Sequence, residues 1–271
     1  YTKISSEYTG IRAETNYFVP LERDHECWWV KLTNNDSRKR QMSCFTFVEY
    51  GCNWNAADDM INLQYTQYIA KMSMEDGIID HGSNIHLPEM PDHFEEKDQG
   101  RHTFQGIAGA EISAYETDRE KFIGPYRSYA NPIAVETGDP EGTLASGDNP
   151  CGSLKTDFEL EPGETAEFVV VMGIGRAAVE GKKILAEYKD KQKVRDEFTR
   201  LVDYWHSRLT AFSAQTPDSD FNSMVNMWNP FNSLITFNWS RAASLVYAGE
   251  RDGLGYRDTV QDFMGAVQLV P

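Results

Sequence analysis

A cluster of side chains suited to binding a polar ligand lies near the C-terminal end of the sequence. Between Gly249 and Asp262 the chain carries arginines, aspartates and a glutamine among several glycines, and Arg241 precedes them. Planar groups of this kind form several directed hydrogen bonds at once, which suits the hydroxyls of a sugar. The glycines let the backbone turn tightly. The residue types therefore allow a sugar-binding site.

The same residues also fit a purely structural network. Asp258 and Asp262 stand four residues apart, on one face of a helix predicted to begin near Asp258 or Thr259. An aspartate at a helix N-terminus is favoured because it accepts hydrogen bonds from free backbone N–H groups and complements the helix dipole. The residues alone leave ligand binding and helix capping equally open.

The other chemistry-bearing patterns match no known site. Residues 173–178 read G-x-G-x-x-A after a predicted strand, but helices follow where a dinucleotide fold needs a parallel strand. Histidines and acids gather in or beside a polar segment, residues 77–101, which we predict to be a long loop. Their spacing fits no helical or finger metal site: His81, His86, Asp92, His93, Glu95, Glu96 and His102. No nucleophile elbow, P-loop or zinc-protease helix occurs, and we expect no metal and no cofactor.

The elements that precede the cluster are predicted to be strands. Apolar and polar residues alternate from Trp28 to Thr33, a turn follows at residues 34–37, and residues 42–50 resume a β pattern, which predicts a hairpin. A second turn at residues 162–164 leads into a buried strand at residues 168–172. Strands and turns at this density favour a β-sandwich.

Beyond residue 175 the periodicity becomes helical. A short helix is predicted first, and then six apolar residues fall on one face of a longer helix: Val194, Phe198, Leu201, Val202, Trp205 and Leu209. Further helices are predicted to start at residues 216–218, to run over 231–247 and to begin near Asp258. The predicted layout is a β-sandwich domain over residues 1–175, a helical linker over 176–215, and the first helices of an α-domain over 216–271.

Composition excludes several classes of protein. The 271 residues carry a formal net charge of -16, which argues against a nucleic-acid partner. The longest uncharged run, residues 221–240, contains five asparagines and Pro230, so no membrane span is expected. The N-terminal residues have no apolar signal region, and the four cysteines show neither CxxC spacing nor a dense disulfide framework. We expect a soluble cytoplasmic protein.

The cluster is also part of a recognisable pattern. The run GYRDT-x-QD at residues 255–262, preceded by WSRAAS at residues 239–244, resembles glycoside hydrolase family 94. Diffuse similarity extends to the β part at residues 17–20, 47–50, 54–59 and 130–135. The resemblance implies a multidomain β + α fold: an N-terminal β-sandwich, a helical linker, an (α/α)6 barrel and a small C-terminal β-domain. It implies an inverting disaccharide phosphorylase.

Site residues follow by resemblance. Arg241, Arg251 and Asp258 are expected to hold hydroxyls of the glycosyl unit on the non-reducing side of the cleaved bond. A supporting shell would comprise Tyr256, Arg257, Gln261 and Asp262. Because phosphate is already an anionic nucleophile, an inverting phosphorylase needs an acid for the leaving oxygen but no carboxylate base. That acid and the phosphate ligands are expected beyond Pro271, so this chain alone is expected to be inactive.

The resemblance leaves the substrate open and permits a rival function. Asp252, where cellobiose phosphorylases carry an arginine, favours the chitobiose and cellobionic acid branches, whereas residues 54–64 look closer to the cellobiose branch. The expected reaction forms an α-sugar 1-phosphate from a β-linked disaccharide and inorganic phosphate, in a homodimer. The rival is a non-catalytic carbohydrate-binding or dimerisation β-sandwich that uses exposed aromatic side chains such as Trp28, Trp29 or Trp54.

Overall fold

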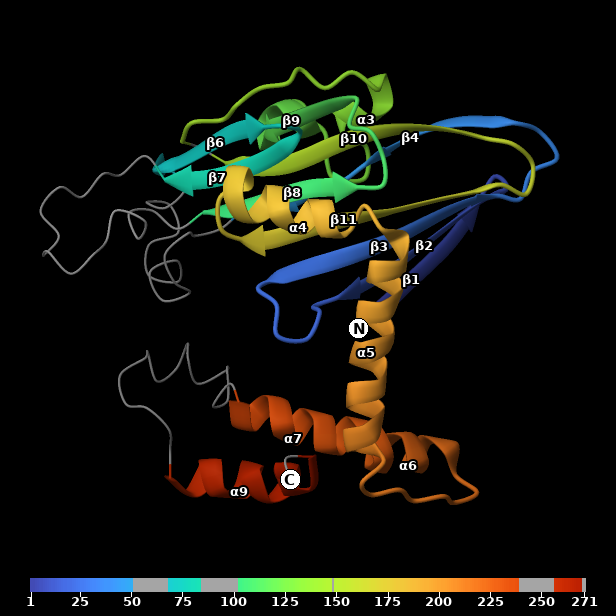
Figure 1. The fold of residues 1–271 in the computed structure, drawn as a ribbon, viewed down its shortest axis with the longest axis vertical. Helices are drawn as coiled ribbons and strands as arrows, with labels where there is room; N and C mark the ends of the chain where they lie inside the picture. The colour runs from blue at the N-terminus through green and yellow to red at the C-terminus, as the bar shows by residue number, and fades with distance from the viewer. Residues whose placement is uncertain (51–67, 84–101, 148, 239–255, 270–271) are drawn as a thin grey trace, which may run out of the picture. The chain divides into compact units, whose positions relative to one another are not determined.

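A computed structural model describes residues 1–50, 68–83, 102–147, 149–238 and 256–269 of the chain (Figure 1). It divides into two compact units, Tyr1–Glu197 and Phe198–Pro271. The described part of unit 1 is a β-structure with short helices, and that of unit 2 is helical.

Two antiparallel sheets form unit 1, and Figure 1 shows them as two layers. The larger sheet has seven strands in the order β1-β2-β3-β11-β8-β7-β6. Their bounds are Thr2–Tyr8 (β1), Ile11–Phe18 (β2), His25–Asn34 (β3), Ala70–Glu75 (β6), Ile78–Ser83 (β7), Thr103–Ala108 (β8) and Thr165–Ile174 (β11). The smaller sheet contains Arg40–Phe45 (β4), Val48–Glu49 (β5), Ala114–Asp118 (β9) and Pro150–Leu160 (β10).

The main core lies between the sheets and follows the period of the strands. Along β3 buried and half-buried residues alternate on either side of the adjacent buried pair Trp29 and Val30. Val30 and Leu32 join the core between the sheets. Phe168 of β11 is 1% exposed and stacks on Phe158 of β10 with ring centroids 5.2 Å apart. The predicted sandwich and its buried strand at residues 168–172 are therefore confirmed within the described residues.

The predicted hairpin at residues 28–50 is wrong. β3 pairs with β2 and β11, whereas β4 pairs with β10 of the other sheet. Asn34 is fully buried, and its side-chain amide donates to the carbonyl oxygens of Arg38 and Leu160 at 2.8 and 2.9 Å. The turn therefore carries the chain from one sheet to the other.

The predicted long loop at residues 77–101 is wrong at its start. Residues 78–83 form β7, whose Ile78 and Ile79 are buried, and this strand pairs with β6 and β8. The polar Asp80 and His81 are also buried, and their hydrogen bonds make burial of this strand possible. Residues 84–101 lie outside the described residues.

Helices follow β11, as predicted. A π-helical turn η2 (Ala177–Gly181) leads into α4 (Lys182–Glu187), and α5 (Lys191–Leu209) comes next. Leu185 of α4 packs so closely on β8 that a Cβ at Gly106 would lie 2.3 Å from Leu185 Cδ1. β11 has only antiparallel neighbours among the described strands, so the G-x-G-x-x-A segment is not part of a dinucleotide fold.

Unit 1 has a second, smaller core beneath two short helices. α2 (Arg119–Ile123) and α3 (Ile133–Thr137) follow β9, and Asp118 caps α2 by accepting from the backbone N–H groups of Glu120 and Lys121. This core is formed by Phe122, Ile123, Ala134 and Cys151, with Phe45 and Phe47 packed against it.

Unit 2 consists of helices in the described range. α6 (Ser219–Ser223), the π-helical turn η3 (Met224–Trp228) and α7 (Asn229–Asn238) run consecutively, and α9 (Tyr256–Ala266) ends in the 3-10 turn η4 (Val267–Leu269). Asp218 caps α6 through the N–H groups of Asp220 and Phe221. The predicted helix start at residues 216–218 is confirmed, because Asp218 is the N-cap of α6. Asp258 is confirmed to lie in a helix, and the residues just before Tyr256 lie outside the described ones.

Two further expectations concern the membrane and the thiols. Among the helices of the described residues, none combines the length and the apolar character that a bilayer crossing needs. Cys27, Cys44 and Cys151 are free, and burial raises the pKa of Cys27 to about 12 and that of Cys44 to about 11. These two thiols are therefore unreactive at neutral pH.

Candidate functional site

Most of the predicted sugar-site residues lie on α9. Tyr256 is 87% exposed at its start, Arg257 and Gln261 are exposed, and Asp262 is half-buried. Asp258 is the third residue of α9 as the structure describes it. α9 thus brings these residues within two turns of one helix.

Several predicted residues lie outside the described residues. They are Arg241, Arg251 and Asp252 of the sugar-site motif, Trp54 of the rival module, Cys52, and His86, Asp92, His93, Glu95 and Glu96 of the polar segment. The roles of Arg241, Arg251 and Asp258 stay predictions.

Apolar packing holds α9 against α7. Leu234 of α7 forms a buried cluster with Ala266 and Leu269, and the rings of Phe237 and Phe263 lie 5.5 Å apart. The two helices approach so closely that a Cβ at Gly265 would lie 2.5 Å from the Ser233 hydroxyl. This contact fixes the C-terminal half of α9, while Tyr256, Arg257 and Gln261 of its first half present polar groups to solvent.

A second anchor comes from the end of α5. Trp205 and Leu209 pack against the buried α7–α9 cluster, and Arg208 Nη1 donates to the carbonyl oxygen of Leu269 at 2.5 Å. The guanidinium of Arg208 also lies over the ring of Tyr204, 4.4 Å from its centroid. His206 is exposed on the same helix.

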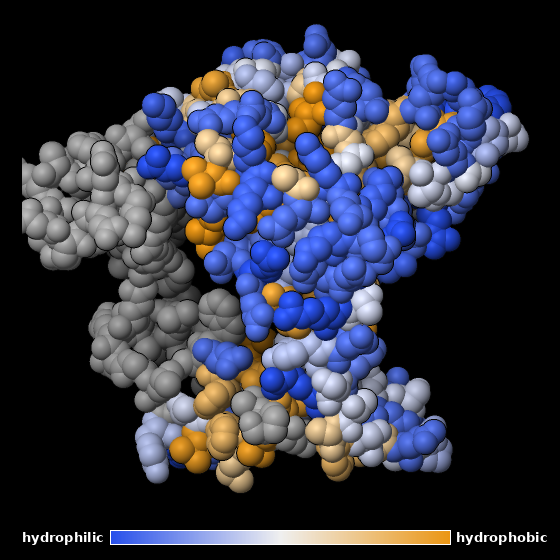
Figure 2. Space-filling model, viewed as in Figure 1, coloured by the Kyte–Doolittle hydropathy of each residue, from blue (hydrophilic) through white to orange (hydrophobic). Residues whose placement is uncertain are grey.

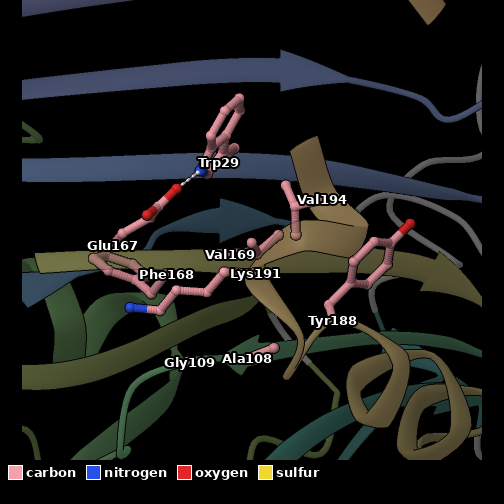
Figure 3. Close-up of a pocket in the computed structure, with 9 residues that line it drawn as sticks. All are labelled: Trp29, Ala108, Gly109, Glu167, Phe168, Val169, Tyr188, Lys191 and Val194. Atoms are coloured by element: carbon pink, nitrogen blue, oxygen red, sulfur yellow. Dashed lines mark hydrogen bonds between the residues drawn. The ribbon is translucent and has the colours of Figure 1, made fainter. Parts of the chain in front are cut away.

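Within unit 1, a small polar joint holds the start of α5 on the larger sheet, and Figure 3 shows its Trp29 and Glu167 side chains. Trp29 Nε1 and Arg195 Nη2 each donate to the carboxylate of Glu167 at 2.7 Å. Lys31 Nζ lies 4.2 Å from the centre of the Trp29 ring. The cavity beside the joint, which Tyr188 helps to line, has a volume of about 10 Å³. That is room for one water molecule and not for a sugar.

The tryptophans proposed for the rival module are not exposed platforms. Trp29 is 9% exposed and bonded to Glu167. Trp28 is half-buried, its Nε1 donates to Glu26 at 2.7 Å, and its ring packs edge-on against Tyr17 at 5.4 Å. This part of the rival interpretation is wrong for both residues, because each ring is already engaged.

The histidines near the polar segment have structural roles. His102 Nδ1 lies 2.5 Å from Asp80 Oδ1, and Asp80 Oδ2 accepts from the backbone N–H of Ala177 at 2.7 Å. His81 lies 3.2 Å from the Thr103 hydroxyl and stacks on Tyr50 with centroids 4.4 Å apart. Among the described residues, no three His, Cys, Asp or Glu side chains are grouped to hold a metal ion.

An open groove lies beside α2 and α3, and sequence reasoning missed it. Its volume is about 860 Å³, and its lining includes Arg119, Arg127 and Tyr129. Arg119 donates to the Tyr129 hydroxyl from Nη2 at 2.7 Å and also pairs with Glu49, which is 70 positions away in sequence. The available signal was two tyrosines and an arginine in a segment bounded by Gly124 and Pro132.

Comparison with known proteins identifies the class and then the family. Residues 1–191 match the family profile described as glycosyl hydrolase 94, supersandwich domain, and residues 204–271 match the glycosyl hydrolase 94 superfamily, catalytic domain. The chain therefore joins a supersandwich to part of a carbohydrate-active catalytic domain. It belongs to the glycosyl hydrolase 94 family, in agreement with the resemblance of its motifs.

Several curated relatives of the chain are disaccharide phosphorylases. The N,N'-diacetylchitobiose phosphorylases of Vibrio proteolyticus and Vibrio furnissii are 33% and 32% identical over 100% of this chain and 32% of their own length. The solabiose phosphorylase of Paenibacillus borealis is 27% identical over 100% of this chain and 33% of its own length. The chain spans about a third of the length of these relatives.

Proposed function

We propose that the protein containing this chain is an inverting disaccharide phosphorylase. Membership of the glycosyl hydrolase 94 family along both units is the observation that carries the proposal. The position of the GYRDT-x-QD motif supports it, because Tyr256, Arg257 and Gln261 are exposed along one helix.

Sugar recognition is assigned to the loop and helix that carry this motif. Arg241 and Arg251 donate to hydroxyl oxygens of the glycosyl unit, and the carboxylate of Asp258 accepts from its hydroxyl groups. Such charge-assisted hydrogen bonds are about twice as strong as neutral ones, and they orient the ring. Tyr256, Arg257, Gln261 and Asp262 support these three side chains.

The chemistry proposed is a single displacement at the anomeric carbon. A phosphate oxygen forms a bond to C1 from the α face while the bond from C1 to the glycosidic oxygen breaks. A carboxylic acid donates a proton to that oxygen, and the products are an α-sugar 1-phosphate and a released sugar. No carboxylate base is needed, because phosphate is already anionic. The acid and the phosphate ligands are assigned to no residue of this chain, which is therefore proposed to be inactive by itself.

The helices of unit 2 are proposed to begin an (α/α)6 barrel after a linker at residues 176–215. Apolar side chains at their surface support this, as Figure 2 shows by the orange colour. Met264 is 71% exposed, Val267 50% and Trp228 45%. Large apolar groups at such exposure are typical of surfaces that other elements cover. A homodimer in the cytoplasm completes the proposal.

Substrate choice is proposed to be of the diacetylchitobiose type. Two relatives with that activity are 33% and 32% identical to the chain, whereas the cellobionic acid phosphorylase of Neurospora crassa is 21% identical over 83% of the chain. Asp252 agrees with this choice, because it favours the chitobiose and cellobionic acid branches over the cellobiose branch.

The test is phosphorolysis by the full-length protein. Diacetylchitobiose, cellobiose and cellobionic acid are offered with inorganic phosphate, and sugar 1-phosphate is measured. Asp258→Asn should lower kcat/KM by about 10- to 100-fold, as expected for a lost charged hydrogen bond. Asp220→Asn is the matched control, because Asp220 is also an acid in the first turn of a helix and should leave turnover unchanged.

Two results would count against the proposal. Absence of sugar 1-phosphate with all three disaccharides would refute phosphorolysis of these substrates. Equal kcat/KM in Asp258→Asn and Asp220→Asn would show that α9 has no part in sugar binding, whichever disaccharide is used.

A further inference from the structure

The groove beside α2 and α3 has the dimensions of a ligand site. Its volume of about 860 Å³ lies within the range of about 300–1,000 Å³ typical of small-molecule pockets. All its lining residues belong to unit 1, and they fall between Asp118 and Glu141. It is therefore separate in the chain from the sugar-site motif on α9.

The groove rests on a rigid base. Phe122 and Ile123 of α2 are buried together with Ala134 of α3. The ring of Phe47 stacks on Phe122 at 4.7 Å and lies 5.6 Å from the ring of Tyr129. Because the base is packed from three segments of the chain, the side chains above it are held in place before any ligand arrives.

The segment between α2 and α3 presents an aromatic ring to solvent. Tyr126 is fully exposed and has a φ of 62°, a left-handed conformation that is rare for a bulky residue. Neighbouring bonds impose this conformation: Arg127 pairs with Glu136 and donates to the carbonyl of Asn131, and the Ser128 hydroxyl bonds to the Asn131 side chain. Strained residues persist where surrounding structure enforces them, and they cluster at binding sites.

The positive and negative side chains that line the groove balance one another, which favours a neutral ligand. Three cations and three acids line the groove: Arg119, Lys121, Arg127, Asp118, Glu120 and Glu141. Each cation already has a carboxylate partner, as in Lys121 Nζ to Glu141 at 2.8 Å. An anionic ligand would have to displace these partners, whereas a neutral ligand meets donors and acceptors side by side.

We propose that this groove binds a neutral oligosaccharide. Sugar hydroxyls both donate and accept, so they can bridge an arginine and its paired carboxylate without breaking the pair. The ring of Tyr129 lines the groove and is 53% exposed, and the fully exposed ring of Tyr126 lies at its border, between the lining residues Pro125 and Arg127. Both rings offer apolar faces with polar tips, which suit the C–H faces of sugar rings. The site would hold a longer glycan on unit 1, independently of turnover on the catalytic domain.

The experiment uses the full-length protein and polymers too long for a disaccharide pocket. Migration is measured by affinity electrophoresis in gels that contain glycol chitin or hydroxyethylcellulose. The wild-type protein should be retarded in at least one gel. Tyr126→Ala should weaken the apparent affinity by about tenfold, as for loss of an aromatic contact residue. Tyr8→Ala is the matched control, because Tyr8 is 81% exposed on β1 and should migrate like the wild type.

A second variant guards against loss of folding. Tyr129→Phe removes the hydroxyl that Arg119 holds and keeps the ring, so it should reduce retardation less than Tyr126→Ala. Phosphorolysis by Tyr126→Ala should equal that of the wild type, which separates this proposal from the proposed function. Absence of retardation in both gels would overturn it. So would a Tyr126→Ala protein that loses its dimer but not its retardation, because the groove would then be a protein interface.

Discussion

The polar joint between unit 1 and the start of α5 is predicted to stabilise unit 1 through one carboxylate. Glu167 accepts a hydrogen bond from Trp29 at 2.7 Å, which Figure 3 shows as a dashed line. Arg195 donates to the other oxygen of the carboxylate, also at 2.7 Å. Glu167→Gln keeps the shape of the side chain. It removes the charge and places an amide N–H group opposite one of the two donors, which leaves that donor without an acceptor.

The expected loss follows from these two bonds. A hydrogen bond to a charged group contributes about 1.5–3 kcal/mol, and an exposed partner reduces this. The side chain of Glu167 is 13% exposed, whereas that of Arg195 is 45% exposed. We therefore expect Glu167→Gln to lower the free energy of unfolding of unit 1 by about 2 kcal/mol at neutral pH.

The same joint predicts a dependence on pH. Burial raises the pKa of Glu167, but the hydrogen bonds from Arg195 and Trp29 outweigh it and bring the pKa below the ordinary 4.5. The folded protein then holds the charged form longer than the unfolded chain does. The stabilisation is present above about pH 4.5 and is lost as the pH falls through the lowered pKa of the folded state.

Urea unfolding followed by tryptophan fluorescence measures both effects. The gap between wild type and Glu167→Gln should stay constant from about pH 7 to about pH 5 and should narrow as the pH falls below about 4.5. Glu75→Gln, at an exposed glutamate of β6, should match the wild type throughout. A gap below about 0.5 kcal/mol at neutral pH, or a gap independent of pH, would refute the reasoning.

Three further perturbations test the packing and the buried histidine. Phe168→Ala should lower the free energy of unfolding of unit 1 by about 3–5 kcal/mol, because the side chain is buried. Phe212→Ala, at a residue that is 50% exposed, should change stability by less than about 0.5 kcal/mol. Equal effects of the two substitutions in calorimetry would contradict this prediction. Burial lowers the pKa of His25, so the unfolded chain takes up a proton at a higher pH than the folded protein, and stability should fall as the pH drops below 6.5. His25→Gln should reduce this dependence of stability on pH in urea titrations. An unchanged dependence would show that His25 does not cause it. Gly265→Ala should lower the free energy of unfolding of unit 2 by about 1–3 kcal/mol, because the added Cβ meets Ser233, and should speed hydrogen exchange of the α9 amides. Combining it with Ser233→Gly should restore the protection of these amides. Unchanged exchange rates in both variants would show that Ser233 moves aside easily.

Local patterns predicted the elements better than their partners. The helical spacing of Val194 and Leu201 identified the buried face of α5, and both residues are buried. Asp218 was found as a helix start because its cap is a local interaction. The hairpin prediction failed because turn chemistry at Asn34 does not specify which sheet receives the next strand. That choice rests on pairing with β10, more than 100 residues later.

The candidate sites differ in the same way. The motif on α9 is contiguous, so its resemblance to the family could be recognised from the sequence and singled out Tyr256 and Gln261. The groove beside α2 depends on Glu49 meeting Arg119, a contact between distant parts of the chain. Spacing along the sequence carries no information about such a pair, and only the fold places it.

The two units differ in the size of their buried cores, and this affects how rigidly each can hold a sugar. Unit 1 encloses its core between two sheets, and its groove is built on the packed rings of Phe47 and Phe122. In unit 2, the buried cluster of Leu234, Ala266 and Leu269 is small, and large apolar side chains such as Met264 face solvent. A groove built on a closed core can be rigid by itself, whereas α9 needs cover for its apolar face to become equally fixed. The proposed barrel would supply that cover and would thereby position the sugar-site residues at the start of α9.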